Sequence, residues 1–130
     1  MAATPSFAAT VAVGAGLIPG TADTSLTAPT NVTTILSGGS SGTAVHELTF
    51  QAVGTTVAGV VNVFLYDGST YHLKDQVPIS PVTSSTTAVA WRTRRQYESM
   101  FVKSGWSLRV SQTVAGNVSL VKVIADAGDY

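Results

Sequence analysis

Short segments in which apolar and polar residues alternate recur along the whole chain, separated by turn residues at intervals of about 8 to 15 residues. In the clearest segment, which begins at Val45, Leu48 and Phe50 share one face while Thr49 lies on the other. A period of two is the side-chain period of a β-strand, and the sequence contains no amphipathic helical pattern of useful length. The pattern therefore predicts an all-β fold.

Eight segments have this strand pattern. They are residues 7–13, 32–36, 45–51, 60–66, 71–79, 89–97, 108–112 and 118–125. Eight short strands joined by turns are typical of a two-sheet antiparallel sandwich of the jelly-roll type. The segment at 60–66 is apolar on both faces apart from Asn62, which predicts a central strand covered on both sides.

The segments between the predicted strands are expected to be turns and connections. The motif GAG, beginning at Gly14, is expected to close the first strand, and the nine residues 98–106 are expected to form a connection. The motif AGN at 115–117 is expected to form a tight hairpin. The final residues, ADAGDY, are polar and are expected to follow the last strand.

The chain length of 130 residues suits one compact domain, and no linker divides the sequence. We expect a single β-sandwich domain over 1–130, with the core in 44–130. Residues 1–43 are expected to supply an N-terminal strand and loops, and the alternative is an extended arm that folds only on assembly.

The segment FLYDGSTYHL places Tyr66, Asp67, Tyr71 and His72 close together. Such a cluster is compatible with a sugar-binding or acid–base site. Asp-Gly between two strand patterns is also the strongest short hairpin signal, with Gly68 supplying a positive φ. The hairpin is the favoured interpretation, and the two tyrosines are then cross-strand neighbours.

Charge is sparse in this chain and unevenly distributed. Charged residues are 11% of the sequence and the formal net charge is zero, a composition that favours association. The first 73 residues contain three acids and no Lys or Arg, whereas the remainder contains seven cations and four acids. This asymmetry could support head-to-tail contacts between copies. We favour the alternative, in which strands from both halves of the chain mix in one sandwich and the charge difference averages out.

Several function classes find no support in the sequence. The chain has no cysteine and no phosphate-binding loop, and His46 and His72 are not at metal-ligand spacing. We therefore expect no enzymatic activity, no cofactor and no metal site. The apolar N-terminus has no cation before Lys74, so it is interpreted as strand and loop instead of a signal peptide, and no apolar run is long enough to cross a membrane.

The motif WRTRRQY at 91–97 is the one basic cluster. On a strand, Arg92 and Arg94 share one face and Arg95 lies on the other with Trp91. Arginine with Trp and Tyr is the composition of protein-interface hot spots, which favours protein contact. The alternatives are a solvated or self-paired sheet face and nucleic-acid binding, and the latter is disfavoured because the domain is neutral.

Residues 44–130 also carry several motifs in a characteristic order. They are ELTFQAVGTTVAGVVNVFLYDGSTYHLKDQVPIS, then SGWSLRVSQ, then the final GDY. In order and spacing, these motifs resemble those of a family of small all-β structural proteins encoded among the virion genes of tailed bacteriophages. The resemblance implies a capsid decoration, or cement, protein on the outside of a phage head, located at the capsid surface of the virion.

The resemblance also implies partners. These are the major capsid protein and further copies of the chain, with a homotrimer favoured. The segment RTRRQYESMFVK is more basic than expected for the family, so interface details are not transferred. The candidate partner-binding residues are Arg92, Arg94, Arg95, Tyr97, Asp129 and Tyr130. The alternative function is a tail-fibre or receptor-binding module that recognises glycans through exposed Tyr and Trp.

Overall fold

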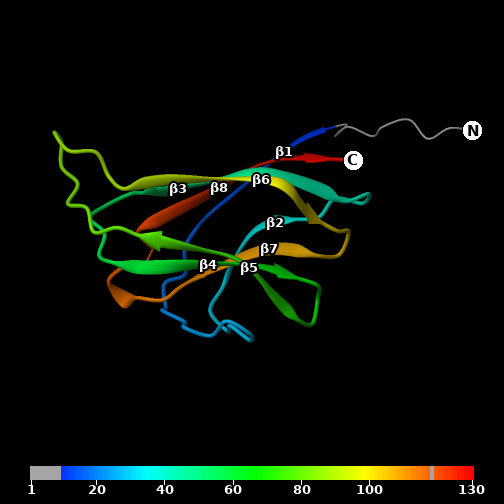
Figure 1. Ribbon diagram of the computed structural model, residues 1–130, viewed down its shortest axis with the longest axis horizontal. Coiled ribbons are helices and arrows are strands. Elements are labelled where there is room, and N and C mark those ends of the chain that lie inside the picture. The colour runs from blue at the N-terminus through cyan, green and yellow to red at the C-terminus, as the bar shows by residue number, and fades with distance from the viewer. Residues whose placement is uncertain (1–9, 118) are drawn as a thin grey trace, which may run out of the picture.

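The computed structural model describes residues 10–117 and 119–130 and consists of two packed β-sheets (Figure 1). The eight strands are β1 (Thr10–Leu17), β2 (Thr33–Ser37), β3 (Thr43–Ala52), β4 (Gly59–Tyr66), β5 (Tyr71–Ile79), β6 (Arg92–Val102), β7 (Ser107–Gln112) and β8 (Val121–Asp129). The prediction of an all-β, two-sheet antiparallel sandwich is confirmed.

The strand order is that of a jelly roll. One sheet, here called the β1 sheet, has the order β1-β8-β3-β6, and the other, the β2 sheet, has the order β2-β7-β4-β5. The nested pairs β1–β8, β2–β7, β3–β6 and β4–β5 are all antiparallel, as they are when a long hairpin rolls up into two Greek keys. Each sheet thus combines strands from the acidic first half and the basic second half of the chain.

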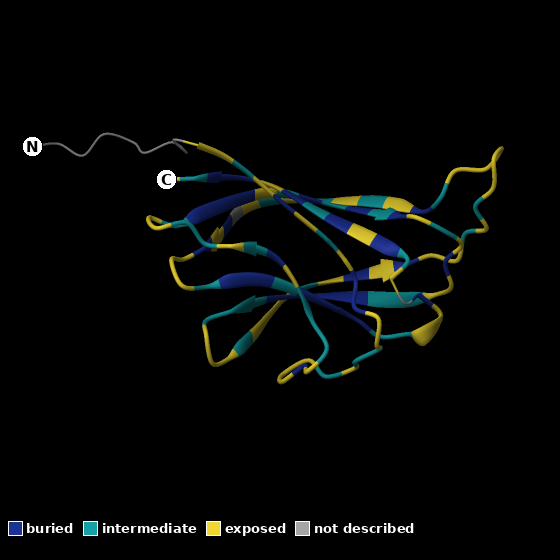
Figure 2. Cartoon of the chain, turned by 180° about the vertical axis from the view of Figure 1, so that it is seen from behind, coloured by how far each residue is buried: buried dark blue, intermediate teal, exposed yellow. Residues whose placement is uncertain are grey.

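The core lies between the two sheets, where the buried stretches of their strands face one another (Figure 2). Phe50 and Leu48 of β3, Met100 of β6 and Leu108 of β7 are among its largest fully buried side chains. Burying a side chain of this size stabilises the fold by about 1.5–3 kcal/mol relative to leaving it exposed. β4 lies between β7 and β5, so the predicted central strand is confirmed.

The first strand ends later than predicted. β1 continues through Gly14 and Gly16 to Leu17, and it pairs with β8 without interruption from Thr10 opposite Asp129. The two glycines are inside the strand because β2 passes directly beneath them. A Cβ atom on Gly14 would collide with the backbone carbonyl of Ile35, so only glycine allows the two strands to lie this close. Residues 7–9 of the predicted strand lie outside the described residues.

Two other boundaries were also predicted wrongly. Residues 98–102 were expected in a connection, but β6 continues to Val102 and buries Met100. The ADAGD segment was expected to follow the last strand, but β8 continues to Asp129. Ala125 and Ala127 are buried there, and such small apolar residues give a weak alternation signal between polar neighbours.

The AGN segment does not form the tight hairpin that was predicted. Residues Ala115–Asn117 form a single turn of 3-10 helix. The buried Asn117 side chain accepts a hydrogen bond from the Val57 amide at 2.9 Å and donates one to the Val57 carbonyl at 2.7 Å. The turn is therefore held by a link to a distant loop, which local turn chemistry does not reveal.

The DGST hairpin is confirmed. Tyr66 lies opposite Tyr71, and Gly68 has a φ of 104°. The Asp67 carboxylate accepts a hydrogen bond from the Thr70 amide at 2.7 Å and lies 3.0 Å from His72 Nε2. These contacts, the His72 side chain first and the turn amides second, lower the pKa of the Asp67 carboxyl group.

The N-terminal part of the described chain belongs to the sandwich. β1 pairs with β8 and β2 pairs with β7, so both strands of residues 10–43 are in the sheets. The arm interpretation for residues 1–9 falls on residues that the structure does not describe. Over the described part of the chain, no helix has the length and apolar character needed to span a membrane.

Candidate partner-binding surface

The structure divides the six predicted binding residues among three places. Arg92 and Arg94 are exposed on the outer face of the β1 sheet. Arg95 and Tyr97 lie on the opposite side of β6 and reach the edge strand β5 of the other sheet. Asp129 lies opposite Thr43, which in turn lies opposite Val102 at the far end of β6. The six residues therefore do not form one site.

Arg95 and Tyr97 are joined to Asp75 of β5. The Tyr97 hydroxyl donates to Asp75 Oδ2 at 2.9 Å, and Arg95 Nε lies 3.7 Å from the same oxygen. Burial, together with the hydrogen bond and charge of Asp75, raises the pKa of the Tyr97 phenol. This cluster connects the edges of the two sheets, and its geometry is that of a structural link.

Replacing Tyr97 with Phe should lower the free energy of unfolding by about 1.5 kcal/mol, because the bond to a carboxylate is lost from a partly buried position. The raised phenol pKa contributes stability below pH about 10 that is lost as the pH rises above it, so the variant should lose less stability there than the parent. Urea denaturation at several pH values measures both effects. Tyr66→Phe, which removes an exposed hydroxyl, should cost less than about 0.5 kcal/mol. Equal losses in the two variants would contradict the structural link.

Asp129 and Tyr130 hold the turn between β2 and β3. The Thr43 hydroxyl donates to Asp129 and accepts a hydrogen bond from the Gly39 amide at 2.8 Å. The Tyr130 amide donates to the Gly42 carbonyl at 3.1 Å. Val102, at this end of β6, lies ten positions along the strand from Arg92, a distance of roughly 30 Å.

A row of side chains that includes two cations crosses the outer face of the β1 sheet and ends at Arg92. Cross-strand pairing aligns Leu17 of β1, Lys122 of β8, Gln51 of β3 and Arg92 of β6. We call these four residues the basic row. Arg92 and Lys122 are exposed, and neither has a hydrogen-bond or ion-pair partner among the described residues. Sequence reasoning missed Lys122 because only the strand register places it in line with Arg92.

Arg94 lies one row further along the same face. It is opposite Thr49, and its Nε atom is 3.3 Å from Glu47 Oε1. Because this ion pair is exposed on the arginine side, it contributes little to stability. The Glu47 carboxylate neutralises the charge of Arg94. Arg92 and Lys122 of the basic row, in contrast, are available to a partner.

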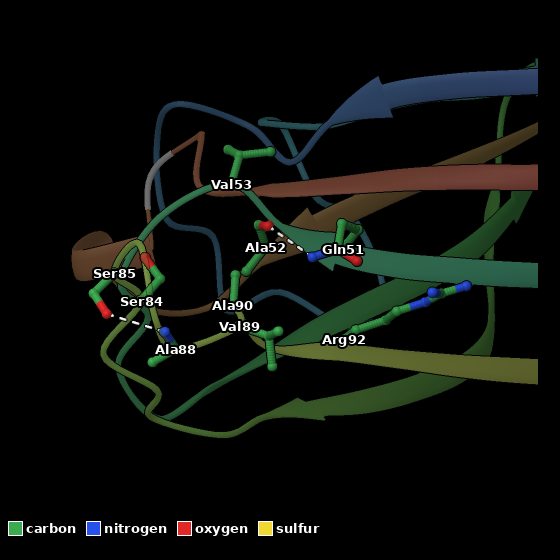
Figure 3. Close-up of a pocket in the computed structure, with 9 residues that line it drawn as sticks. All are labelled: Gln51, Ala52, Val53, Ser84, Ser85, Ala88, Val89, Ala90 and Arg92. Atoms are coloured by element: carbon green, nitrogen blue, oxygen red, sulfur yellow. Dashed lines mark hydrogen bonds between the residues drawn. The ribbon is translucent and has the colours of Figure 1, made fainter.

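The end of the basic row at Arg92 adjoins an open pocket with a volume of about 650 Å³, which we call the hollow (Figure 3). It is lined by Gln51, Ala52, Val53, Ser84, Ser85, Ala88, Val89, Ala90 and Arg92. Val89 and Val53 are 89% and 59% exposed. The connection between β5 and β6 forms one side of the hollow and projects at the end of the molecule away from the start of β1 and the end of β8 (Figure 1).

The hollow combines exposed apolar side chains with exposed cations at its margin. This combination matches a protein surface that presents apolar and acidic groups. Within the described residues, no group of three or more His, Asp or Glu side chains is placed to hold a metal ion. No protein-family model and no curated protein matches the sequence of this chain.

Proposed function

We propose that this chain is a virion structural protein, a cement protein that binds the outside of a tailed-phage head and stabilises it. The observation that carries the proposal is the hollow with exposed Val53 and Val89, beside Arg92 and Lys122, two exposed cations that pair with no other described residue. The jelly roll also supports it, because two packed sheets give a stiff scaffold for a broad contact surface. The motif resemblance of residues 44–130 supplies the phage context.

In this proposal, the hollow contacts the major capsid protein. Burial of the two valines supplies apolar contact area, and the cations select an acidic surface and accelerate encounter. One such contact alone supplies only a modest binding free energy. Several copies held together, with three copies as the arrangement expected from the resemblance, would add their contacts through multivalency.

The test is sedimentation of the purified protein with expanded empty heads that lack it. The parent chain should bind to saturation, and binding should weaken as salt is added because the cations are exposed. The double variant Arg92→Ala, Lys122→Ala should bind about tenfold more weakly or worse, since a truncated interface Arg often costs more than 1 kcal/mol. Lys74→Ala is the matched control, because it removes an exposed cation of β5, on the edge of the other sheet, and should leave binding unchanged.

Unchanged binding by the double variant, or an equal loss in the Lys74 control, would contradict the proposed surface. Binding to host glycans and not to heads would favour the tail-fibre alternative. That alternative requires an open aromatic ring, and the residues lining the hollow include none. The half-exposed Tyr66 and Tyr71 pack on each other and on Arg109, whose guanidinium lies 4.2 Å from the centre of the Tyr66 ring.

A further inference from the structure

The two sheets end in four edge strands, which are β1 and β6 in one sheet and β2 and β5 in the other. An edge strand presents unpaired backbone N–H and C=O groups to any other extended chain. Natural proteins protect such edges with charged side chains, proline, bulges or a very short strand. One of the four edges lacks this protection.

Three edges are protected. β2 has five residues and its register shifts near Leu36. β5 carries Lys74 and Pro78 and has a register shift at Lys74. β6 carries three arginines and Glu98. Each of these strands is thus a poor template for a further strand.

β1 has none of these features. Its sequence, TVAVGAGL, contains no charge and no proline, and its register against β8 is continuous over eight residues. Val11 and Val13 are 84% and 64% exposed on the outer face. β1 is therefore a long, regular, apolar edge.

The free edge of β1 is open to a neighbour. Within the described part of the chain, β1 pairs with β8 alone. β2 lies close to β1, but a Cβ on Gly14 would point at the Ile35 carbonyl, so β2 lies beneath the inner face. Inner-face side-chain positions point perpendicular to the direction of sheet hydrogen bonds, so β2 does not occupy the edge.

We infer that β1 pairs with β1 of a second copy, antiparallel and about a two-fold axis. The two β1 sheets would then form one continuous sheet across the dimer, with the apolar outer residues of both edges side by side. The contact is isologous, since the same strand is used by both copies. A trimer requires a heterologous contact instead, so this inference replaces the trimer with a two-fold pair as the basic oligomer.

The charges beside β1 favour a second copy over a foreign strand. On the outer face, β8 presents Lys122, Ile124 and Asp126 in order along the strand, beside the outer residues of β1. A two-fold axis reverses this order in the partner, so Lys122 of one copy lies in line with Asp126 of the other. The two β1 strands lie between these charges and place them three strand spacings, about 14 Å, apart. Their attraction is therefore a weak, salt-sensitive contribution that favours the antiparallel orientation.

This inference does not rest on the proposed capsid role, because self-association is a property of the purified chain. The β1 edge is also separated from Arg92 by the width of the sheet, since β8 and β3 lie between β1 and β6. Pairing through β1 therefore leaves the hollow accessible. Failure of dimerisation and failure of head binding are distinguishable in separate experiments.

The test is sedimentation equilibrium of the full chain over a concentration series. The parent should have twice the chain mass, and Val13→Lys should shift the equilibrium to single chains, because a lysine on an edge strand opposes strand addition. Val11→Lys should act in the same way. Gln96→Lys is the matched control, since Gln96 lies in the same cross-strand row as Val13 but on the opposite edge, and it should leave the dimer intact.

Far-UV circular dichroism of each variant confirms that the fold is retained. Three results would overturn the inference. They are a parent chain that remains single at every concentration, a mass of three chains, and a dimer that survives both lysine substitutions.

Discussion

Phe50→Ala should lower the free energy of unfolding by about 4 kcal/mol, the middle of the range for removal of a buried Phe. Phe50 is fully buried in β3, which lies between β8 and β6 in the middle of the β1 sheet. The substitution removes apolar area from the core and leaves a cavity that the strands on either side, tied by their ladder hydrogen bonds, cannot fill. Because domains of this size are stable by only about 5–15 kcal/mol, the loss is a large share of the total.

The measurement is guanidinium denaturation followed by tryptophan fluorescence, for which the buried Trp91 is a core reporter. Phe101→Ala is the matched control, because Phe101 is on the same sheet but 52% exposed on its outer face. It should cost no more than about 0.5–1 kcal/mol. Similar losses for the two phenylalanines would mean that Phe50 does not pack the core as the structure places it.

Gly14→Ala should lower the free energy of unfolding by about 3 kcal/mol, at the upper end of the cost of overpacking. The added methyl group would meet the Ile35 carbonyl and carbon, which are backbone atoms of β2 and cannot rotate away. The two strands would have to separate along one side of the sandwich. The smaller conformational entropy of alanine in the unfolded chain offsets only about 0.4–1 kcal/mol of this.

Gly16→Ala is the control for this effect, on the same strand and the same face. Its methyl group would meet the tips of the Thr33 and Ile35 side chains, at 2.9 and 3.2 Å, which can adjust. We expect a cost of about 1 kcal/mol. If the two alanine variants were equally stable in thermal and denaturant unfolding, the close approach of β1 and β2 would be refuted.

Much of the fold follows from local sequence. The alternation around Leu48 and Phe50 and the apolar run of β4 report burial directly, because side-chain period and hydrophobicity are local properties. The DGST turn is equally local, since Gly68 and Asp67 act on their own neighbours. The boundaries that were missed depend on distant segments. Gly14 is in a strand because β2 passes beneath it, which no local pattern encodes.

The candidate site was less predictable. Sequence alternation placed Arg92 and Arg94 on one face and Arg95 on the other, as the structure has them. The pairing of Tyr97 with Asp75 joins residues 22 positions apart in different sheets, and it was not foreseen. Lys122 joins the basic row only through the register of β8 with β3. Such tertiary pairings depend on the order and register of the strands, which local sequence patterns do not reveal.

The pairing of Thr10 with Asp129 has a practical consequence for protein engineering. Opposite residues of an antiparallel pair are about 5 Å apart, so polypeptide leading into β1 and out of β8 departs from one corner of the sandwich. A few added residues would bridge that gap, which makes the chain a candidate for circular permutation. A cargo fused at either side would be carried at the corner remote from the hollow, leaving that surface unobstructed for display on a particle.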